Sequence, residues 1–113
     1  MGEITVDFIS KDPWQMVLVE EGPWDDVSVS LTTLQTRLYS CLDAVIDGQL
    51  AEQFPESRGK PVTLRVDCYG APRKEMEDFF GRFSSSALQL PDYKASLEAS
   101  PHVSGIQFAI NFN

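Results

Sequence analysis

The sequence predicts an α+β fold, a two-layer sandwich in which a four-stranded mixed sheet, in the order β-β-α-β-α-β, carries two helices on one face. Four segments alternate apolar and polar residues, which is the period of a strand, and two segments show the longer apolar period of a helix. Every one of these segments has a single apolar side, so one core between two layers buries them all. A chain of 113 residues has the size of one domain, residues 1–113.

The first two strands are predicted at residues 3–9 and 14–21, with a turn at residues 11–13 between them. Because alternate residues of a strand point to opposite faces, we expect Phe8 to point to the core and Ile9 to point outward. The second strand is expected to direct Trp14, Met16 and Leu18 inward. The two strands therefore form a hairpin.

A long amphipathic helix is predicted at residues 27–46, and Asp25 and Asp26 suit its N-terminus while Gly48 suits the position after its end. Gln35 also falls within the apolar arc of this helix, so we expect its amide to be buried and hydrogen-bonded to backbone groups. The apolar residues of the arc are Val27, Leu31, Leu34, Leu38, Cys41, Leu42, Val45 and Ile46.

The second half of the chain adds a strand at residues 61–69, a helix that opens near Pro72, and a closing strand at residues 105–113, "GIQFAINFN". Because a helical crossover favours parallel neighbours, the second and third strands, or the third and fourth, are expected to be parallel. The residues expected to face the core are Val62, Leu64, Val66 and Cys68 on the third strand, Met76, Phe79, Phe80 and Phe83 on the helix, and Ile106, Phe108, Ile110 and Phe112 on the last strand.

The face of the sheet opposite the helices is expected to stay open. Four of its residues are Arg65, Tyr69, Gln107 and Asn111, which alternate with core positions on the last two strands. A face of this mixed composition is either plain solvent surface or a docking or dimerisation surface.

The net charge of −8 is unevenly distributed. Residues 1–56 hold eleven acidic and two basic residues, whereas the remaining residues hold six acidic and seven basic ones. Such a surface repels nucleic acid and anionic lipid and attracts basic proteins, so we expect a basic protein as partner and neither nucleic acid nor membrane. The sequence shows neither an apolar run of the ~20 residues that a membrane span needs nor a secretory leader, so we expect a cytoplasmic location.

Patterns that carry chemistry are absent from the sequence. The only histidine is His102, and a hydrolase that pairs it with one of the serines at 84–86 has no nucleophile-elbow pattern to support it. Cys41 and Cys68 are expected to be reduced core thiols, because a disulfide would require the helix of one to lie directly on the strand of the other. We therefore expect a protein without enzymatic activity, metal or cofactor.

The segment "VEEGPWDD" places Glu20, Glu21, Asp25 and Asp26 around Trp24. Each residue has a local structural reason, because aspartates favour a helix N-terminus and an aromatic side chain there packs onto the core. The functional interpretation is that an indole among carboxylates forms a binding hot spot for a basic partner. A calcium site is a third interpretation, but the spacing of an EF-hand loop is absent.

Several motifs of the chain resemble a family of small bacterial cytosolic proteins of unknown function. They are "VDFIS" near the start, Trp24-Asp25-Asp26, and "LQTRLYSCLDAVIDGQL" with its Leu34-Gln35 pair and Gly48. The resemblance covers roughly residues 4–80 and implies the same two-layer fold but no activity.

Two functional hypotheses follow. The first is a protein-interaction module, in its most specific form an inhibitor like the acidic immunity proteins that neutralise basic toxins, to which the chain is similar in kind. The alternative is a homo-oligomeric scaffold, a homodimer for example, that uses the open sheet face or the edge of the last strand.

Overall fold

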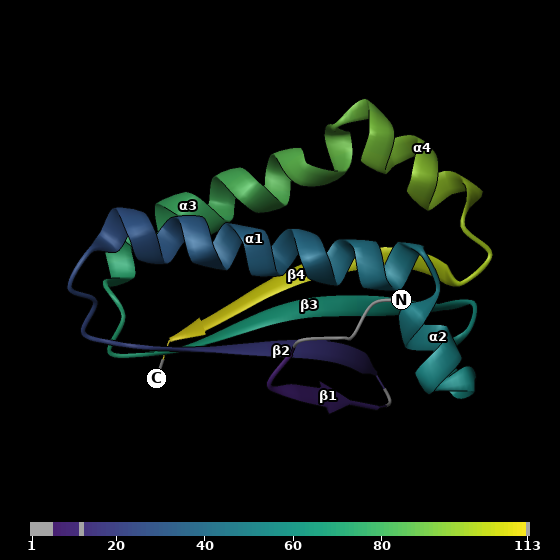
Figure 1. The fold of residues 1–113 in the computed structure, drawn as a ribbon, viewed down its shortest axis with the longest axis horizontal. Helices are drawn as coiled ribbons and strands as arrows, with labels where there is room; N and C mark the ends of the chain where they lie inside the picture. Colours follow the sequence, from purple (N-terminus) through teal and green to yellow (C-terminus); the bar gives the residue numbers. More distant parts are fainter. Residues whose placement is uncertain (1–5, 12, 113) are drawn as a thin grey trace.

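The computed structural model describes residues 6–11 and 13–112 of the chain. The predicted α+β fold is confirmed, with a four-stranded mixed sheet below a layer of helices (Figure 1). Ile4, Thr5 and Asn113, which the sequence places in the first and last strands, lie outside the described residues. The elements are β1 (Phe8–Ser10), β2 (Trp14–Glu21), α1 (Val27–Ile46), α2 (Gln49–Gln53), η1 (Pro55–Ser57), β3 (Lys60–Tyr69), α3 (Arg73–Ser86), η2 (Ala87–Gln89), α4 (Pro91–Ala99) and β4 (Val103–Phe112).

The strands lie in the order β1-β2-β3-β4 across the sheet. β1 runs antiparallel to β2, as a hairpin requires, and β2, β3 and β4 are mutually parallel. Both parallel pairings considered from the sequence are therefore present. Because crossovers between parallel strands are right-handed as a rule, two crossovers that advance in the same direction place their helices on the same face. α1 and α3 accordingly cover one face of the sheet and leave the other open (Figure 1).

α1 begins and ends at the residues that the sequence predicts. The Val29 backbone N–H donates to the Asp26 carboxylate at 3.2 Å, which caps the first turn. Beyond the helix, Gly48 adopts a left-handed conformation with φ 96°, and the His102 ring packs where a Cβ would stand. The buried side chains of α1 are Leu34, Leu38, Cys41, Leu42, Ala44, Val45 and Ile46.

The predicted burial of Gln35 is wrong, because its side chain is exposed. Gln35 lies about 100° around the helix from Leu34, whose side chain is fully buried. The sheet and α3 cover a narrower stripe of α1 than the apolar arc suggests. Gln35 stands at the margin of that stripe, where its amide can bond water and needs no buried partner.

The inward and outward sides of β1 are the reverse of those expected. Ile9 pairs with Met16 of β2, and Phe8 pairs with Val17. Because paired residues of neighbouring strands share a face, Ile9 joins Met16 on the core side and Phe8 joins Val17 on the open face. Phe8 is consequently 63 % exposed, whereas Val17, which is flanked by Phe8 and by Arg65 of β3, is buried.

α3 covers the sheet with the apolar residues that the sequence predicts, Met76, Phe79, Phe80 and Phe83, all of which are buried. Phe80 and Phe83 contact the ring of Phe108 on β4 edge to face. The two long connections contain more helix than expected. α2 buries Leu50 and is followed by Phe54, whose ring packs on Trp14 at 5.7 Å between centroids.

Truncation of one α1 side chain tests this packing. Leu38 is 0 % exposed, so Leu38→Ala leaves a cavity between α1 and the sheet and should lower the free energy of unfolding by about 2–5 kcal/mol. Urea unfolding followed by circular dichroism measures this loss. Gln35→Ala, on the same helix, is the matched control and should change stability by less than about 0.5 kcal/mol. Equal losses for the two variants would contradict the orientation of α1.

Candidate functional site

The centre of the open face is a hydrogen-bonded network of polar side chains across three strands. The Arg65 guanidinium donates through Nε and Nη2 to the two Asp67 carboxylate oxygens, at 3.1 Å each, and through Nη1 to Gln15 at 2.6 Å. Asn111 of β4 donates to the same Asp67 carboxylate at 3.1 Å. Two of the predicted open-face residues, Arg65 and Asn111, therefore bond within the sheet. Tyr69, Gln107 and Asn111 are exposed, and Arg65 is partly buried.

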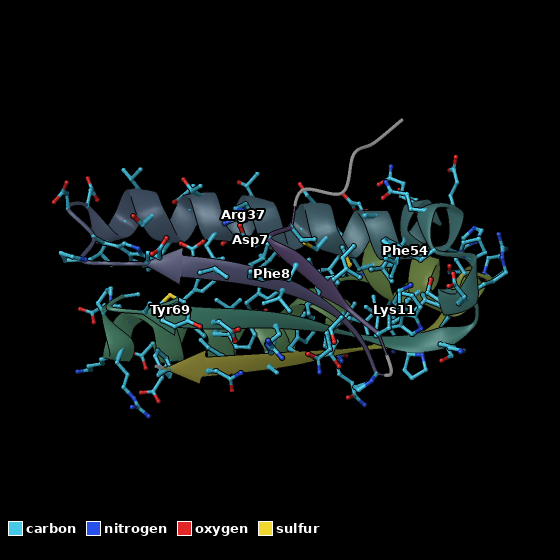
Figure 2. All side chains as sticks on the ribbon, turned by 90° about the horizontal axis from the view of Figure 1, so that it is seen from below. Asp7, Phe8, Lys11, Arg37, Phe54 and Tyr69 are labelled. Atoms are coloured by element: carbon cyan, nitrogen blue, oxygen red, sulfur yellow. The ribbon has the colours of Figure 1, made fainter. Side chains whose placement is uncertain are left out.

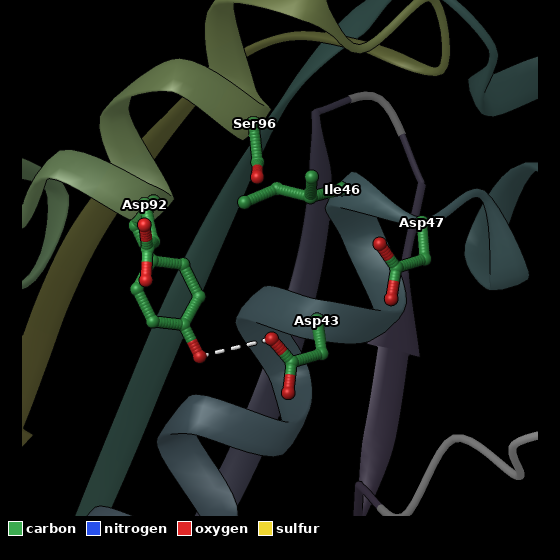
Figure 3. A pocket seen from close by; sticks show the side chains of 6 residues that line it. Asp43, Ile46, Asp47, Asp92 and Ser96 are labelled. Carbon is green, nitrogen blue, oxygen red and sulfur yellow. Dashed lines mark hydrogen bonds between the residues drawn. The ribbon is translucent and has the colours of Figure 1, made fainter.

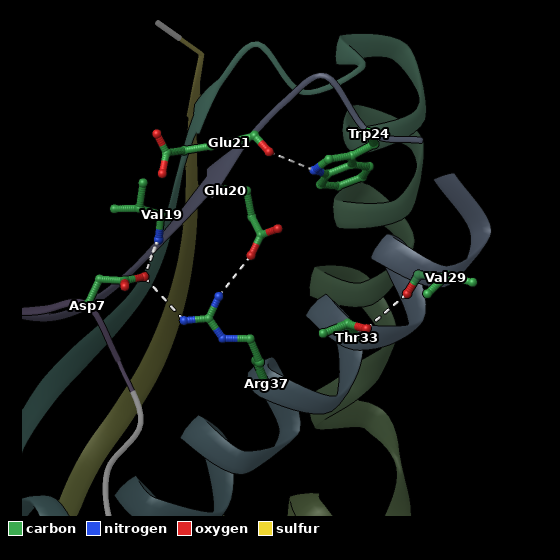
Figure 4. Close-up of polar contacts among 8 residues, drawn as sticks. All are labelled: Asp7, Val19, Glu20, Glu21, Trp24, Val29, Thr33 and Arg37. Atoms are coloured by element: carbon green, nitrogen blue, oxygen red, sulfur yellow. Dashed lines mark hydrogen bonds and ion pairs between the residues drawn. The ribbon is translucent and has the colours of Figure 1, made fainter. Parts of the chain in front are cut away.

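A second network, centred on Arg37, joins α1 to β2 and to the residue before β1 (Figure 4). Arg37 Nη1 lies 2.9 Å from the Glu20 carboxylate, and Nη2 lies 3.2 Å from that of Asp7. The Asp7 carboxylate also accepts the Val19 backbone N–H at 2.7 Å, at the point where β2 extends beyond the short β1. Asp7 thus accepts the hydrogen bond that a neighbouring strand would otherwise accept, and it also orients Arg37.

Glu20 does not supply the free carboxylate that the sequence suggested. Its side chain is 14 % exposed and its charge is paired with that of Arg37. Burial raises the pKa of the Glu20 carboxyl above its ordinary value, although Arg37 acts in the opposite direction. Glu20 is therefore part of the link between sheet and helix.

The rest of the "VEEGPWDD" segment builds the start of α1. Trp24 is partly buried on the core, and its indole Nε1 donates to the Glu21 backbone carbonyl at 3.1 Å (Figure 4). A Cβ at Gly22 would overlap the backbone carbonyl of Gly70, so glycine allows the ends of β2 and β3 to approach closely. The side chains of Glu21, Asp25 and Asp26 are exposed.

The open face has a hollow of about 450 Å³ at the C-terminal end of β2, lined by Asp7, Phe8, Val19, Glu21 and Tyr69. We call it the Phe8–Tyr69 hollow. Phe8 is 63 % exposed and Tyr69 46 % exposed, and both belong to the open face (Figure 2). Among the described residues, Glu21 has no ion-pair partner, whereas the charge of Asp7 is shared with Arg37. The hollow combines aromatic surface with an available negative charge.

The sequence placed Tyr69 on the open face and Glu21 among the candidate binding residues, but it did not bring them together. The structure does so because Glu21 and Tyr69 are register partners at the ends of β2 and β3. Phe8 was missed because alternation alone assigned it to the core. The charged residues on either side of this strand, Asp7 and Lys11, could have indicated a short edge strand. In such a strand the alternation of residues does not by itself decide which side faces the core.

A second hollow, of about 270 Å³, lies between the end of α1 and α4 (Figure 3). It is lined by Asp43, Asp47, Asp92 and Tyr93, with Ile46 and Ser96. The Tyr93 hydroxyl donates to the Asp43 carboxylate at 2.9 Å, and burial together with this carboxylate raises the pKa of Tyr93. In the part of the chain that the structure describes, no three His, Cys, Asp or Glu side chains are grouped as metal ligands would be.

The remaining reactive side chains are apart from both hollows. His102 Nδ1 lies 3.3 Å from the Arg58 guanidinium, and its backbone N–H donates to Ser100. Cys41 and Cys68 are free thiols in the core, as expected, and burial raises the pKa of each to about 11. No helix in the described residues combines the length and apolarity needed to cross a membrane.

Fold and surface together define a two-layer α+β protein whose open sheet face carries a hollow lined by aromatic and acidic side chains. The chain belongs to a family of unknown function, DUF6572, whose model matches residues 2–100. Neither a curated protein nor a solved structure matches the chain. Family membership confirms the expectation of a family of unknown function and assigns no activity.

The burial of Glu20 predicts a pH dependence of stability. Because folding raises its pKa above 4.5, its contribution to stability is full below pH 4.5 and is lost as pH rises through the folded-state pKa. Glu20→Gln removes this titration. The unfolding free energy of the parent protein minus that of Glu20→Gln should therefore fall as pH rises above 4.5. Urea unfolding at a series of pH values measures it, with the exposed Glu21→Gln as control for net charge. A difference that rises with pH would contradict the assignment.

Proposed function

We propose that the protein is a protein-binding module that takes a basic partner at the Phe8–Tyr69 hollow. One observation carries the proposal. The large apolar side chains that stand exposed among the described residues are Phe8, Val29, Tyr69 and Leu90, and two of these four flank the same hollow. Exposed aromatic residues beside an available carboxylate are the usual make-up of a binding hot spot.

The chemistry of the hollow favours an arginine side chain of the partner. A planar guanidinium stacks on an aromatic face and pairs with a carboxylate at the same time. Phe8 and Tyr69 offer the aromatic faces, and Glu21 offers the carboxylate. Asp7 holds its position through Arg37 and Val19, so it lines the hollow without moving on binding.

The charge of the chain supports the same class of partner. The hollow contains the carboxylates of Asp7 and Glu21, and the chain as a whole carries a net charge of −8. Negative charge of this kind speeds the approach of a basic protein and makes association sensitive to salt. In its most specific form the proposal is an inhibitor in the bacterial cytosol that blocks a basic toxin in the manner of an immunity protein. Such inhibition requires only that the covered surface of the toxin include its working site.

The proposal is tested by titrating ¹⁵N-labelled protein with a short peptide of alternating arginine and glycine. Amide signals of Phe8, Val19, Glu21 and Tyr69 should shift, and the shifts should weaken as salt is added. The double variant Glu21→Gln/Tyr69→Ala should weaken binding by at least about tenfold, because it removes one carboxylate and one aromatic face.

A matched double variant, Asp47→Asn/Leu90→Ala, removes one carboxylate and one exposed apolar side chain away from the hollow. It should bind the peptide as the parent does. Shifts centred on Asp43 and Asp92, or equal losses in the two double variants, would show that the peptide follows net charge alone and would overturn the proposal.

A further inference from the structure

The strand β4 forms one edge of the sheet and pairs on one side only, with β3, among residues 6–11 and 13–112 (Figure 2). Its ten residues, Val103–Phe112, therefore present a row of backbone N–H and C=O groups outward. A register irregularity opposite Lys60 and Pro61 affects only the beginning of the strand. The rest of β4 is a regular edge that can accept another strand.

Nothing in the composition of β4 protects this edge from pairing. Natural edge strands are shielded by charge, proline or shortness. The other edge has such a shield, because β1 is only three residues long and lies between Asp7 and Lys11. β4 contains no charged residue and no proline over its whole length, "VSGIQFAINF". The two edges thus differ in kind.

The apolar row of β4 is also left incompletely covered. Its register partners on β3, Leu64 and Val66, are 1 % and 0 % exposed. Phe108 and Ile110, one strand further out on the same face, are only partly buried although they pack against the same core. A further strand beside β4 would cover the exposed sides of Phe108 and Ile110, just as β4 covers the side chains of β3.

We infer that β4 pairs with β4 of a second copy of this chain, so that two sheets join into one. Because β4 carries no charged residue, the same edge of a second copy can pair with it without repulsion between like charges. Residues 1–56, which carry the excess of acidic residues, form β1, β2, α1 and α2, whereas β3, α3 and β4 come from the half with seven basic and six acidic residues. Two chains of net charge −8 can therefore meet at β4 with their acidic halves turned away from each other.

A two-fold axis perpendicular to the sheet generates this pairing. It makes the two β4 strands antiparallel and keeps both helical layers on the same side of the joined sheet. Near the axis, Gln107 and Ala109 of one copy face the open side beside those of the other. The Phe8–Tyr69 hollows then stand at the two outer ends, so the dimer goes beyond the proposed function and presents that site twice.

The mass of the full-length protein across the micromolar range tests the dimer. Light scattering after size exclusion should give twice 12.6 kDa. Ala109→Lys places like charges from both copies near the axis and should raise the dissociation constant by at least about tenfold. Thr36→Lys, on the exposed side of α1, makes the same change of charge and should leave the mass unchanged. Circular dichroism confirms that both variants are folded.

Amide hydrogen exchange gives a readout that needs no variant. Protection of residues 103–112 should increase as protein concentration rises, while that of β1 should not change. A monomer at every concentration overturns the inference, and so does a dimer that survives Ala109→Lys with β4 exchanging at an unchanged rate. If β4 binds a different protein, the isolated chain stays monomeric at every concentration, which overturns the inference.

Discussion

The right-handed sense of the two crossovers determines where the helices of this protein lie. β2, β3 and β4 are parallel and follow one another in order across the sheet, so both connections advance in the same direction. Right-handed connections then place α1 and α3 on one face, where they bury Met16, Leu18 and Leu64 beneath them. The opposite face can receive no helix from either crossover. An open face is therefore a consequence of the strand order and exists before any partner covers it.

The same topology separates charge in space. Because the strands keep their chain order, the acidic first half of the sequence occupies the β1 side and the nearly neutral second half occupies the β4 side. Arg37, a basic residue on the acidic side, forms ion pairs with Asp7 and Glu20. Glu21 is exposed there, and it lies beside Phe8 and Tyr69 in the hollow. One edge is thus suited to a basic partner and the other to a surface without charge.

The sequence predicted most of the fold, and its failures have a common cause. α1 and β2 match their predicted bounds because long periodic segments define their own apolar side. The faces of Phe8 and Ile9 were predicted the wrong way round. In a strand of only three residues, the face of each side chain is set by pairing with the neighbouring strand, here with Val17 and Met16. Gln35 was misplaced because the width of a buried stripe depends on what packs against it. The sequence singled out Glu21 and Tyr69 separately, because only the register of β2 with β3 brings these two residues side by side.

A soluble paramagnetic relaxation agent distinguishes the covered face of the sheet from the open one. With ¹³C- and ¹⁵N-labelled protein, side-chain signals of Tyr69 and Gln107 should broaden strongly on addition of the agent, while those of Leu38 and Leu64 should persist. Equal broadening of the two groups, or protection of Tyr69 and Gln107 in a protein shown to be monomeric, would contradict the account.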